Sequence, residues 1–381
     1  MIEFVGPIKD VCLGIYDGPH ATPKESDVGP VFLGIKNVTK DGRLDLSEIR
    51  HVSEQEFPQW TRRVVPRKDD IVFSYEATLH LYALIPEGFR GCLGRRMALV
   101  RPDTTKVVPR FLHYYFLSPA WKALMLSNVL TGATVDRIPI ARFPNFEVRL
   151  PRLSAQQRIA DTLSAYDDLI ENNRRRIALL EQSARLLYRE WFVHLRFPGH
   201  EHVKVVDGVP EGWTRSPVSK LATLAGGKQF ESDKLTDAGA YPVFGGNGIQ
   251  GYAHEKTHDD FVIAFGRVGA YCGSVHWSYE GAWINNNASS LIPHEYPELF
   301  LHHMLHCDFR NYRKGAAQPF IPNGVLSTIS FIGPSRMLAA EFCEQVRSMR
   351  LQQLILAKQN KKLAQARDLL LPRLMSGDLM V

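Results

Sequence analysis

Three short motifs contain residue types that can bind a phosphate group or a metal ion. The segment GGNGIQG places Gly246, Gly248 and Gly251 at the spacing of a dinucleotide-binding loop. Such a loop is followed by a helix whose N-terminus holds the pyrophosphate, but the residues after Gly251 show no helical pattern. We therefore expect a loop in which backbone amides and the side chain of Asn247 can approach phosphates or base edges.

The other two motifs are incomplete. In GGKQ, which begins at Gly226, Gln229 stands where a phosphate-binding loop needs Ser or Thr to hold magnesium. In HHMLHC, His302 and His306 lie four residues apart beside Cys307, but no further ligand follows at a suitable spacing. The chain also lacks an Asn/Asp-Pro-Pro-Tyr/Phe methyltransferase signature and a nuclease cluster. We expect no catalytic site, no metal and no cofactor in this chain.

The composition indicates a globular protein of several parts. The chain has 381 residues, of which 45% are hydrophobic and 23% are charged, and this length exceeds that of one ordinary domain. A formal charge of +6 gives a mild preference for polyanions such as nucleic acid. The five scattered cysteines contain no CxxC pair, and no signal peptide or long apolar run is visible. We expect a soluble, cytoplasmic protein with reduced thiols.

The chain contains an internal repeat. The segment that begins FLHYYF at Phe111 has a faint copy that begins FLHHML at Phe300. Both copies continue with Gly-Ala, at Gly132-Ala133 and Gly315-Ala316, and then with Ile-Pro. From Gly132 onward, each residue corresponds to the one 183 positions later, so that Leu163 matches Val346.

The repeat predicts the order domain, helix, domain, helix. Runs such as VFLGIKNV and FVIAF, rich in β-branched and aromatic residues, predict strands in both domains. The fold class is therefore α+β, and a Pro- and Gly-containing linker runs from Arg196 to Trp213.

A long helix is predicted from Leu153 to about Trp191, because this stretch has no Pro or Gly and has an apolar heptad pattern. Ser154 and Gln157 are expected to form a capping box at its start. About 40 residues would give a rod of roughly 60 Å. The seam consists of Ile159, Leu163, Tyr166, Ile170, Asn173, Ile177, Leu180, Ala184, Leu187 and Trp191.

A second helix after Ser335 repeats the pattern. Its seam consists of Phe342, Val346, Met349, Gln353, Leu356, Asn360, Leu363, Arg367, Leu370 and Leu374. Either helix alone could lie on its own domain, but two such helices in a duplicated chain favour an antiparallel coiled coil. Matching Ile159 with Leu374 places Asn173 opposite Asn360, and a buried asparagine pair can fix the register.

Several segments resemble the specificity subunits of type I restriction-modification systems. They are DGPHATPK from Asp17, GPVFLGIKNV from Gly29, the helix that begins LSAQQRIADTL at Leu153, VPEGW from Val209 and LLLPRLMSGDL from Leu369. The resemblance runs nearly from end to end, and the helix with QQRIA and ENNRR is its most specific part.

The resemblance implies a non-catalytic DNA-binding subunit. Two target recognition domains, residues 1–152 and 198–334, would each read one half of a bipartite site in double-stranded DNA. The helices, residues 153–197 and 335–381, would set the spacer. The implied partners are methyltransferase subunits, two copies, and a restriction and translocase subunit, which would carry S-adenosylmethionine, ATP and magnesium.

Candidate DNA contacts are polar or basic side chains in loops and at strand ends, because these groups can pair with base edges or phosphates. In the first domain they are Lys36, Asn37, Tyr75, Arg95, Arg96 and Arg137. In the second domain they are Lys228, Gln229, Asn247, Arg267, Tyr271, Lys314 and Gln318. About half of such residues would be ordinary surface or turn residues.

Two questions stay open at this point. Arg174, Arg175 and Arg176 could form a solvated helix face or contact a methyltransferase subunit or the spacer DNA. A stand-alone, repressor-like DNA-binding protein is an alternative, although the sequence has no helix-turn-helix signature. An enzyme that uses the glycine loop is disfavoured by the missing helix.

Overall fold

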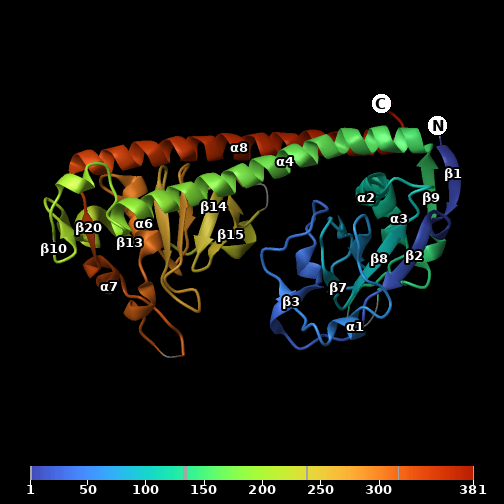
Figure 1. The fold of residues 1–381 in the computed structure, drawn as a ribbon, viewed down its shortest axis with the longest axis horizontal. Helices are drawn as coiled ribbons and strands as arrows, with labels where there is room; N and C mark the ends of the chain where they lie inside the picture. Colours follow the sequence, from blue (N-terminus) through green and yellow to red (C-terminus); the bar gives the residue numbers. More distant parts are fainter. Residues whose placement is uncertain (1, 132–134, 237–238, 316, 381) are drawn as a thin grey trace. The chain divides into compact units, whose positions relative to one another are not determined.

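The chain folds into two units, each with its own core (Figure 1). A computed structural model describes all residues except 1, 132–134, 237–238, 316 and 381. Gly132, Ala133 and Ala316 of the sequence repeat therefore lie outside the described residues. Unit 1 contains residues 1–173 and 358–381, and unit 2 contains residues 174–357.

Unit 1 is built on two small sheets and a strand pair. The four-stranded sheet has the order β2 (Cys12–Asp17), β8 (Met97–Pro102), β5 (Ile71–Ser74) and β6 (Tyr82–Leu84). The three-stranded sheet has the order β4 (Arg50–His51), β3 (Ser26–Leu33) and β7 (Gly91–Leu93). β1 (Ile2–Pro7) pairs with β9 (Glu147–Pro151). The short helices are α1 (Phe57–Trp60), α2 (Pro109–Leu117) and α3 (Pro119–Ser127).

Unit 2 repeats this plan. The four-stranded sheet has the order β13 (Ala222–Gly226), β19 (Ala288–Pro293), β16 (Val262–Gly266) and β17 (Val275–Ser278). The three-stranded sheet has the order β15 (Gly248–Ala253), β14 (Tyr241–Gly245) and β18 (Trp283–Ile284). β12 (Thr214–Pro217) pairs with β20 (Ser330–Gly333), and β10 (Val205–Val206) with β11 (Val209–Pro210). The short helices are α5 (Val218–Leu221), α6 (Pro297–His306) and α7 (Asn323–Thr328).

The strand topology confirms the internal repeat. Counting from β1 in unit 1 and from β12 in unit 2, the strands occupy the same places in sheets of the same size. The agreement includes the one parallel contact in each three-stranded sheet, β3 with β7 and β14 with β18. The fold is α+β in both units, as expected from the sequence.

Each unit also contains part of two long helices. α4 (Leu153–Tyr188) continues as a short π-helical stretch, Arg189–Val193, and α8 (Arg336–Ser376) contains Pro372 in its last turns. α4 begins one residue before Ser154, so the predicted capping box is wrong: Ser154 lies inside the first turn. The side-chain Nε2 of Gln157 instead donates to Oδ1 of Asp161 at 2.8 Å.

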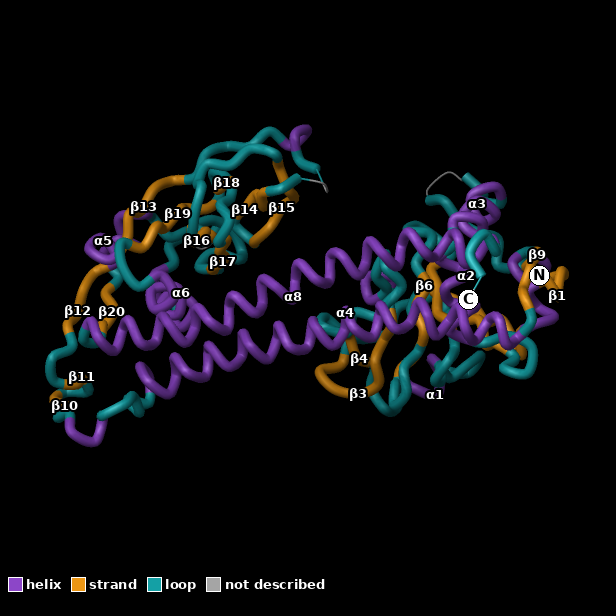
Figure 2. The backbone as a smooth tube through the Cα atoms, turned by 90° about the horizontal axis from the view of Figure 1, so that it is seen from above, coloured by secondary structure: helices purple, strands orange, loops and turns teal. Residues whose placement is uncertain are grey.

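Within each unit, α4 and α8 lie side by side and run antiparallel (Figure 2). In unit 1, Nδ2 of Asn173 donates to Oδ1 of Asn360 at 2.9 Å. In unit 2, Nε2 of Gln353 donates to the carbonyl oxygen of Ile177 at 3.3 Å. None of the twenty residues of the two predicted seams is exposed: each is buried or half-buried. The seams therefore form the helix contact in both units.

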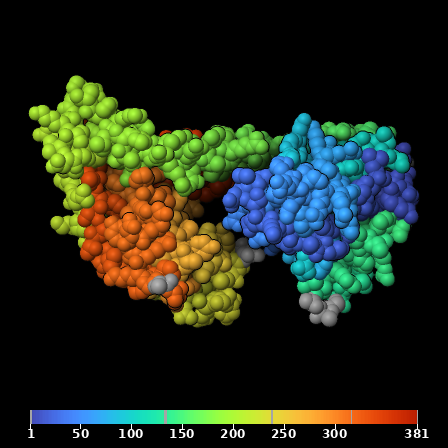
Figure 3. All heavy atoms as spheres, turned by 60° about the horizontal axis from the view of Figure 1, so that its bottom comes forward, coloured from blue at the N-terminus to red at the C-terminus, as the bar shows by residue number. Residues whose placement is uncertain are grey.

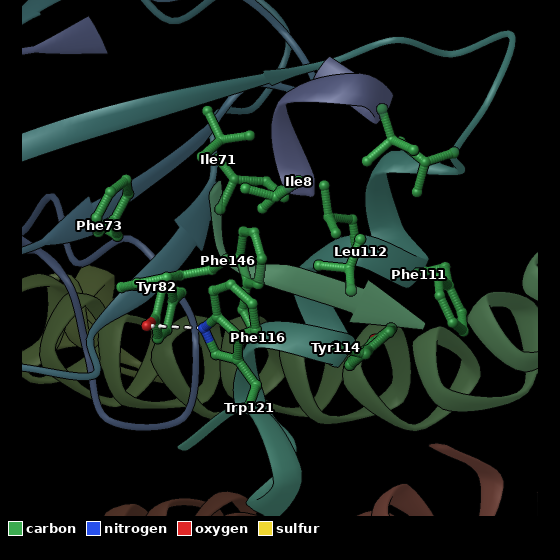
Figure 4. Packing of buried hydrophobic residues seen from close by; sticks show 14 of the residues in the cluster. Ile8, Ile71, Phe73, Tyr82, Phe111, Leu112, Tyr114, Phe116, Trp121 and Phe146 are labelled. Carbon is green, nitrogen blue, oxygen red and sulfur yellow. Dashed lines mark hydrogen bonds between the residues drawn. The ribbon is translucent and has the colours of Figure 1, made fainter. Parts of the chain in front are cut away.

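The core of unit 1 includes both helices. Aromatic rings dominate it, and Nε1 of Trp121 donates to the hydroxyl of Tyr82 at 3.0 Å (Figure 4). Ile159 and Leu163 of α4 and Leu374 of α8 belong to the same buried cluster. Burial of these apolar side chains fixes the helix pair against the sheets of this unit.

Unit 2 holds the other ends of the helices in the same way. Tyr188 at the end of α4 and Trp191 in the π-helical stretch after it pack with Phe342 and Val346 in the first turns of α8. A separate cluster around Phe265 and Phe300 fills the space between the four-stranded sheet and α6. In the described part of the chain, no helix is long and apolar enough to cross a membrane.

Candidate nucleic-acid interface

Five loops of unit 2 meet at one end of its sheets. The backbone amide of Arg267, directly after β16, donates to the carbonyl oxygen of Asn287, between β18 and β19, at 3.2 Å. The hydroxyl of Ser274 donates to the carbonyl oxygen of Gly246, in the turn between β14 and β15, at 2.8 Å. The amide of Lys228, after β13, donates to Ile284 at 2.8 Å. These hydrogen bonds fasten the loops to one another.

The fifth loop, described at residues 314–315 and 317–320, joins the same group through a β-bridge between Val268 and Phe320. In Figure 3, the yellow and orange segments of unit 2 form one continuous surface. Six of the seven residues predicted for this domain are exposed: Lys228, Gln229, Asn247, Tyr271, Lys314 and Gln318. The structure therefore brings the predicted residues of the second domain to one end of unit 2.

Arg267, the seventh, is half-buried at the centre of this group. Its Nη2 donates to the carbonyl oxygen of Asn286 at 3.2 Å, which holds the guanidinium against the loop between β18 and β19. Its Nε is buried and has no hydrogen-bond partner among the described residues. The guanidinium is thus ordered by the protein and retains donor capacity for a ligand.

The sequence interpretation missed an amide cluster beside Arg267. Nδ2 of Asn285 donates to Oε1 of Gln250 at 2.8 Å, and Oδ1 of Asn285 accepts from the amides of Phe230 at 3.2 Å and Asn286 at 2.8 Å. Asn286 and Asn287 are exposed. Amide side chains of this kind pair with adenine edges. The run of three asparagines, residues 285–287, was the available sequence signal.

The glycine motif of this region forms a hairpin. Gly246 lies in the turn between β14 and β15, and Gly248, with a φ of +98°, begins β15. A Cβ at Gly266 would lie 2.2 Å from the carbonyl oxygen of Gly246, so the two backbones need this close approach. A strand, not a helix, follows the turn, and this geometry does not form a dinucleotide site.

Unit 1 has the same loop framework. The amide of Tyr75 donates to the carbonyl oxygen of Arg96 at 3.2 Å, just as Arg267 donates to Asn287 in unit 2. The carbonyl oxygen of Tyr75 accepts from Ile138 at 2.7 Å, and that of Arg267 accepts from Ile321 at 2.9 Å. Tyr75 therefore occupies the place of Arg267, and Arg96 that of Asn287.

Four of the six residues predicted for the first domain are accessible. Lys36, Arg95 and Arg137 are exposed, and Arg96 is half-buried. Arg137 forms a β-bridge with Glu76, and Nε of Arg96 lies 3.4 Å from a carboxylate oxygen of Glu76. Lys36 lies 3.5 Å from Glu48, so carboxylates reduce the positive charge of this end more than in unit 2.

The other two residues require a correction. Asn37 is only 2% exposed, and its amide donates to the carbonyl oxygens of Asp45 and Glu48 while Oδ1 accepts from the amide of Gly34. Both donor hydrogens and the oxygen of this side chain hold its own loop, and the side chain is too deeply buried to reach DNA. A polar residue beside a strand-like run looks the same in sequence whether it faces inward or outward.

Tyr75 is the second correction, because its ring is also interior, at 5% exposure. Burial raises the pKa of its hydroxyl, and nearby Asp17 and Glu76 raise it further. This hydroxyl has no hydrogen-bond partner in the described part of unit 1. Tyr75 is therefore an interior residue whose side chain does not itself reach the surface.

The histidines of HHMLHC serve the packing of unit 2. His303 accepts or donates a 2.7 Å hydrogen bond with the hydroxyl of Tyr188, and the ring of His302 stacks on Tyr188. Burial lowers the pKa of His302 to about 4 and that of His303 to about 3. Across the described residues, no group of three His, Cys, Asp or Glu side chains is placed to hold a metal ion.

Known proteins are similar to this chain in sequence and in fold. The chain matches the family described as "Type I restriction modification DNA specificity domain" over residues 31–182 and again over residues 210–358. The type I restriction enzyme MjaIX specificity subunit of Methanocaldococcus jannaschii is 21% identical over 364 residues, which cover 87% of this chain and 82% of that protein. The type I restriction enzyme EcoprrI specificity subunit of Escherichia coli is 34% identical over 127 residues, or 32% of each chain.

A crystal structure of the type I restriction-modification system S subunit from M. genitalium has the same fold. Its TM-score is 0.54 at 16% sequence identity, over 97% of this chain and 95% of that chain. The first matched segment lies mostly in unit 1 and the second almost entirely in unit 2, and each includes the loop end of its unit. Since the family's domain occurs twice and covers most of the sequence, the chain belongs to the DNA specificity family of type I restriction-modification systems.

Proposed function

We propose that each unit reads one half of a bipartite target in double-stranded DNA through its loop end. The observation that carries the proposal is the shared framework in which Arg267 and Tyr75, with Asn287 and Arg96, hold equivalent backbone positions. One framework with different side chains can present the same docking geometry to two different base sequences.

The side chains at each loop end fit two kinds of DNA contact. In unit 2, Arg267 and the amides beside it have the donors and acceptors that pair with guanine and adenine edges. Lys228 and Lys314 are exposed cations suited to phosphates. In unit 1, Arg95 and Arg137 are exposed cations like these two lysines. The formal charge of +6 of the whole chain supports attraction to a polyanion.

The two long helices would set the distance between the half-sites. α4 has 36 residues and α8 has 41, which at 1.5 Å per residue correspond to about 54 Å and 62 Å. Each helix is one continuous element that contributes to the cores of both units. A rod of this length spans more than one turn of B-DNA, about 34 to 36 Å.

The catalytic activities would come from partner subunits. We expect two methyltransferase subunits and a restriction and translocase subunit, which would bind S-adenosylmethionine, ATP and magnesium. Arg175 and Arg176 are exposed on α4 and would contact a methyltransferase subunit or the spacer DNA. The EcoprrI and MjaIX relatives are named as specificity subunits of restriction enzymes, which supports this assignment.

The spacer proposal can be tested by shortening both helices together. Removal of residues 174–180 and 353–359 deletes one heptad from each helix and keeps Asn173 opposite Asn360. The rod would lose about 10 Å, which is about three base pairs. Sequencing of methylated adenines in cells that carry the partner subunits should show both half-sites unchanged and a spacer shorter by about three base pairs.

A changed half-site, or an unchanged spacer, would contradict this proposal. A matched control deletes residues 205–211, which include the β10–β11 hairpin outside the heptads, and should leave the spacer as it was. Co-purification decides the more general question. A chain that binds DNA tightly and never associates with a methyltransferase subunit would favour a repressor-like protein instead.

A further inference from the structure

Unit 2 contains a cavity of about 430 Å³ between α6, the β12–β20 pair and the first turns of α8. The residues that matter for its shape and chemistry are Thr214, Lys220, Tyr296, His303, Phe331 and Ala339. All of them belong to unit 2, and none is among the loop residues considered for DNA contact. The cavity is therefore separate from the proposed DNA interface.

In unit 1, two larger side chains occupy the equivalent place. In the strand pairs, Phe4 pairs with Leu150 as Thr214 pairs with Gly333, so Phe4 corresponds to Thr214. The ring of Phe4 packs against the core of unit 1 and covers the backbone of Gly6. In unit 2 this ring is replaced by the short side chain of threonine.

The second difference lies on the long helices. Gln156 lies three residues after the start of α4, and Ala339 lies three residues after the start of α8. Oε1 of Gln156 accepts from the amide of Val108, the N-cap of α2, at 2.9 Å. Its Nε2 donates to the carbonyl oxygen of Pro151 at 2.8 Å. Ala339 has no carboxamide with which to make the equivalent contacts to Tyr296, the N-cap of α6, and to Pro334.

The two side chains that occupy the equivalent place in unit 1, Phe4 and Gln156, indicate which chemical groups would fit the cavity of unit 2. An aromatic ring would take the place of Phe4, against the His303 and Phe331 rings, which stack at 5.0 Å with an interplanar angle of 4°. An amide, with one donor and one acceptor, would take the place of the Gln156 side chain. A peptide supplies both groups, since its backbone amides adjoin its side chains.

The rim of the cavity adds a charge preference. Lys220 is exposed, and no carboxylate pairs with it in the described part of unit 2. Arg336 is 86% exposed and lies 3.9 Å from Glu295, a weak pairing at this distance. The two cations outnumber the single carboxylate at the rim. An acidic residue next to the aromatic one would therefore be attracted to this site.

We propose that this cavity binds a peptide segment of another protein in which an acidic residue adjoins an aromatic residue. The aromatic ring would fill the space left by Thr214, a backbone amide would satisfy the end of α6, and the carboxylate would approach Lys220. This site is separate from the proposed DNA interface, because none of its lining residues is assigned to bases or phosphates.

The test uses the full-length protein and two acetylated, amidated dipeptides, Glu-Phe and Glu-Ala, with binding followed by saturation-transfer NMR. We expect Glu-Phe to bind at least about tenfold more tightly than Glu-Ala, because only the former buries a ring. The variants Ala339→Gln and Thr214→Phe each restore a residue of unit 1. Each should weaken Glu-Phe binding by about tenfold or more and raise the Tm. Ala340→Gln, at the exposed neighbouring position, should change neither.

Two results would overturn the proposal. The first is equal binding of both dipeptides, or binding that Ala339→Gln and Thr214→Phe leave unchanged while both variants fold. The second is binding of Glu-Phe without binding of the longer acetylated peptide Ala-Glu-Phe-Ala-Ala-amide, since a segment of a protein continues on both sides of the aromatic residue. Methylation of the normal target by the assembled complex should be retained in Ala340→Gln, which checks that the control is intact.

Discussion

Nδ2 of Asn173 donates a 2.9 Å hydrogen bond to Oδ1 of Asn360, inside the contact between α4 and α8. Nδ2 of Asn360 in turn donates to the carbonyl oxygen of Ile170 at 3.2 Å. Asn173 is 8% exposed, so its amide is removed from solvent. A shift of either helix by one residue would leave buried amides without partners, and the pair therefore favours one register.

The asparagine pair can be tested by a double-mutant cycle. Asn360→Leu alone leaves the buried amide of Asn173 unpaired, and it should lower the free energy of unfolding by about 1 to 3 kcal/mol. Replacing both asparagines by leucine should recover most of this loss, because two apolar groups of similar size pack together. Urea denaturation measures each value. Strictly additive effects of the two substitutions would show that the asparagines do not interact.

A buried ion pair holds α6 to α8 in unit 2. Nη1 of Arg350 lies 3.0 Å from Oε1 of Glu298, whose side chain is 3% exposed, and the guanidinium also lies over the ring of Tyr279. Burial lowers the pKa of Arg350 to about 10. The arginine stays charged near neutral pH and depends on its carboxylate partner.

Glu298→Gln should therefore be strongly destabilising. It leaves the buried guanidinium without a countercharge, and the expected loss is about 3 kcal/mol in the free energy of unfolding. Glu181→Gln is the matched control, because Glu181 pairs with Arg185 at 2.6 Å on the exposed face of α4 and should cost less than about 1 kcal/mol. Similar losses in both variants would mean that the burial of Arg350 has no energetic consequence.

The helices could be predicted from the sequence because their signal is local and repeated. A heptad pattern places every seam residue by simple counting, and matching Ile159 with Leu374 was enough to align Asn173 with Asn360. Helix ends were less predictable: Ser154 has the right type for a cap, but the chain becomes helical one residue earlier, at Leu153. Competition between neighbouring caps depends on the whole local backbone.

The loop ends could be predicted only in part, because the direction of a side chain in a loop depends on distant strands. Asn37 and Tyr75 have the same residue types as accessible DNA-binding groups but point into unit 1. Arg267, by contrast, lies at the centre of its loop cluster. The equivalence of Tyr75 and Arg267 rests on backbone hydrogen bonds to Arg96 and Asn287, which no local sequence pattern encodes.

Buried histidines should make the protein sensitive to acid. Burial lowers the pKa of His302 and of His113 to about 4 each, from 6.5. Above pH 6.5 these rings are neutral in both states and have no effect. As the pH falls from 6.5 to about 4, the unfolded chain binds protons that the folded chain does not, so stability is lost.

His302→Phe should reduce this loss, since it removes one of the buried titrating rings. The slope of unfolding free energy against pH should decrease by up to about 1.4 kcal/mol per pH unit between pH 6 and pH 4.5. His202, which is 83% exposed, provides the control: His202→Gln should leave the slope unchanged. Denaturation series at several pH values measure both. An unchanged slope in His302→Phe would show that this ring titrates normally in the folded protein.

Base and phosphate contacts should differ in how their loss affects DNA binding, and this difference tests the interface of unit 2. Arg267→Ala removes a guanidinium ordered by Asn286, and should cost about 1 to 3 kcal/mol of discrimination in the second half-site only. Lys314→Ala should weaken binding to all sequences and reduce the slope of log affinity against log salt by about 1. Competition binding with duplexes altered in one half-site separates the two cases. Arg137→Ala, at the loop end of unit 1, should affect only the first half-site. If Arg267→Ala reduced discrimination equally in both halves, the arginine would act through the fold of the protein and not through a base.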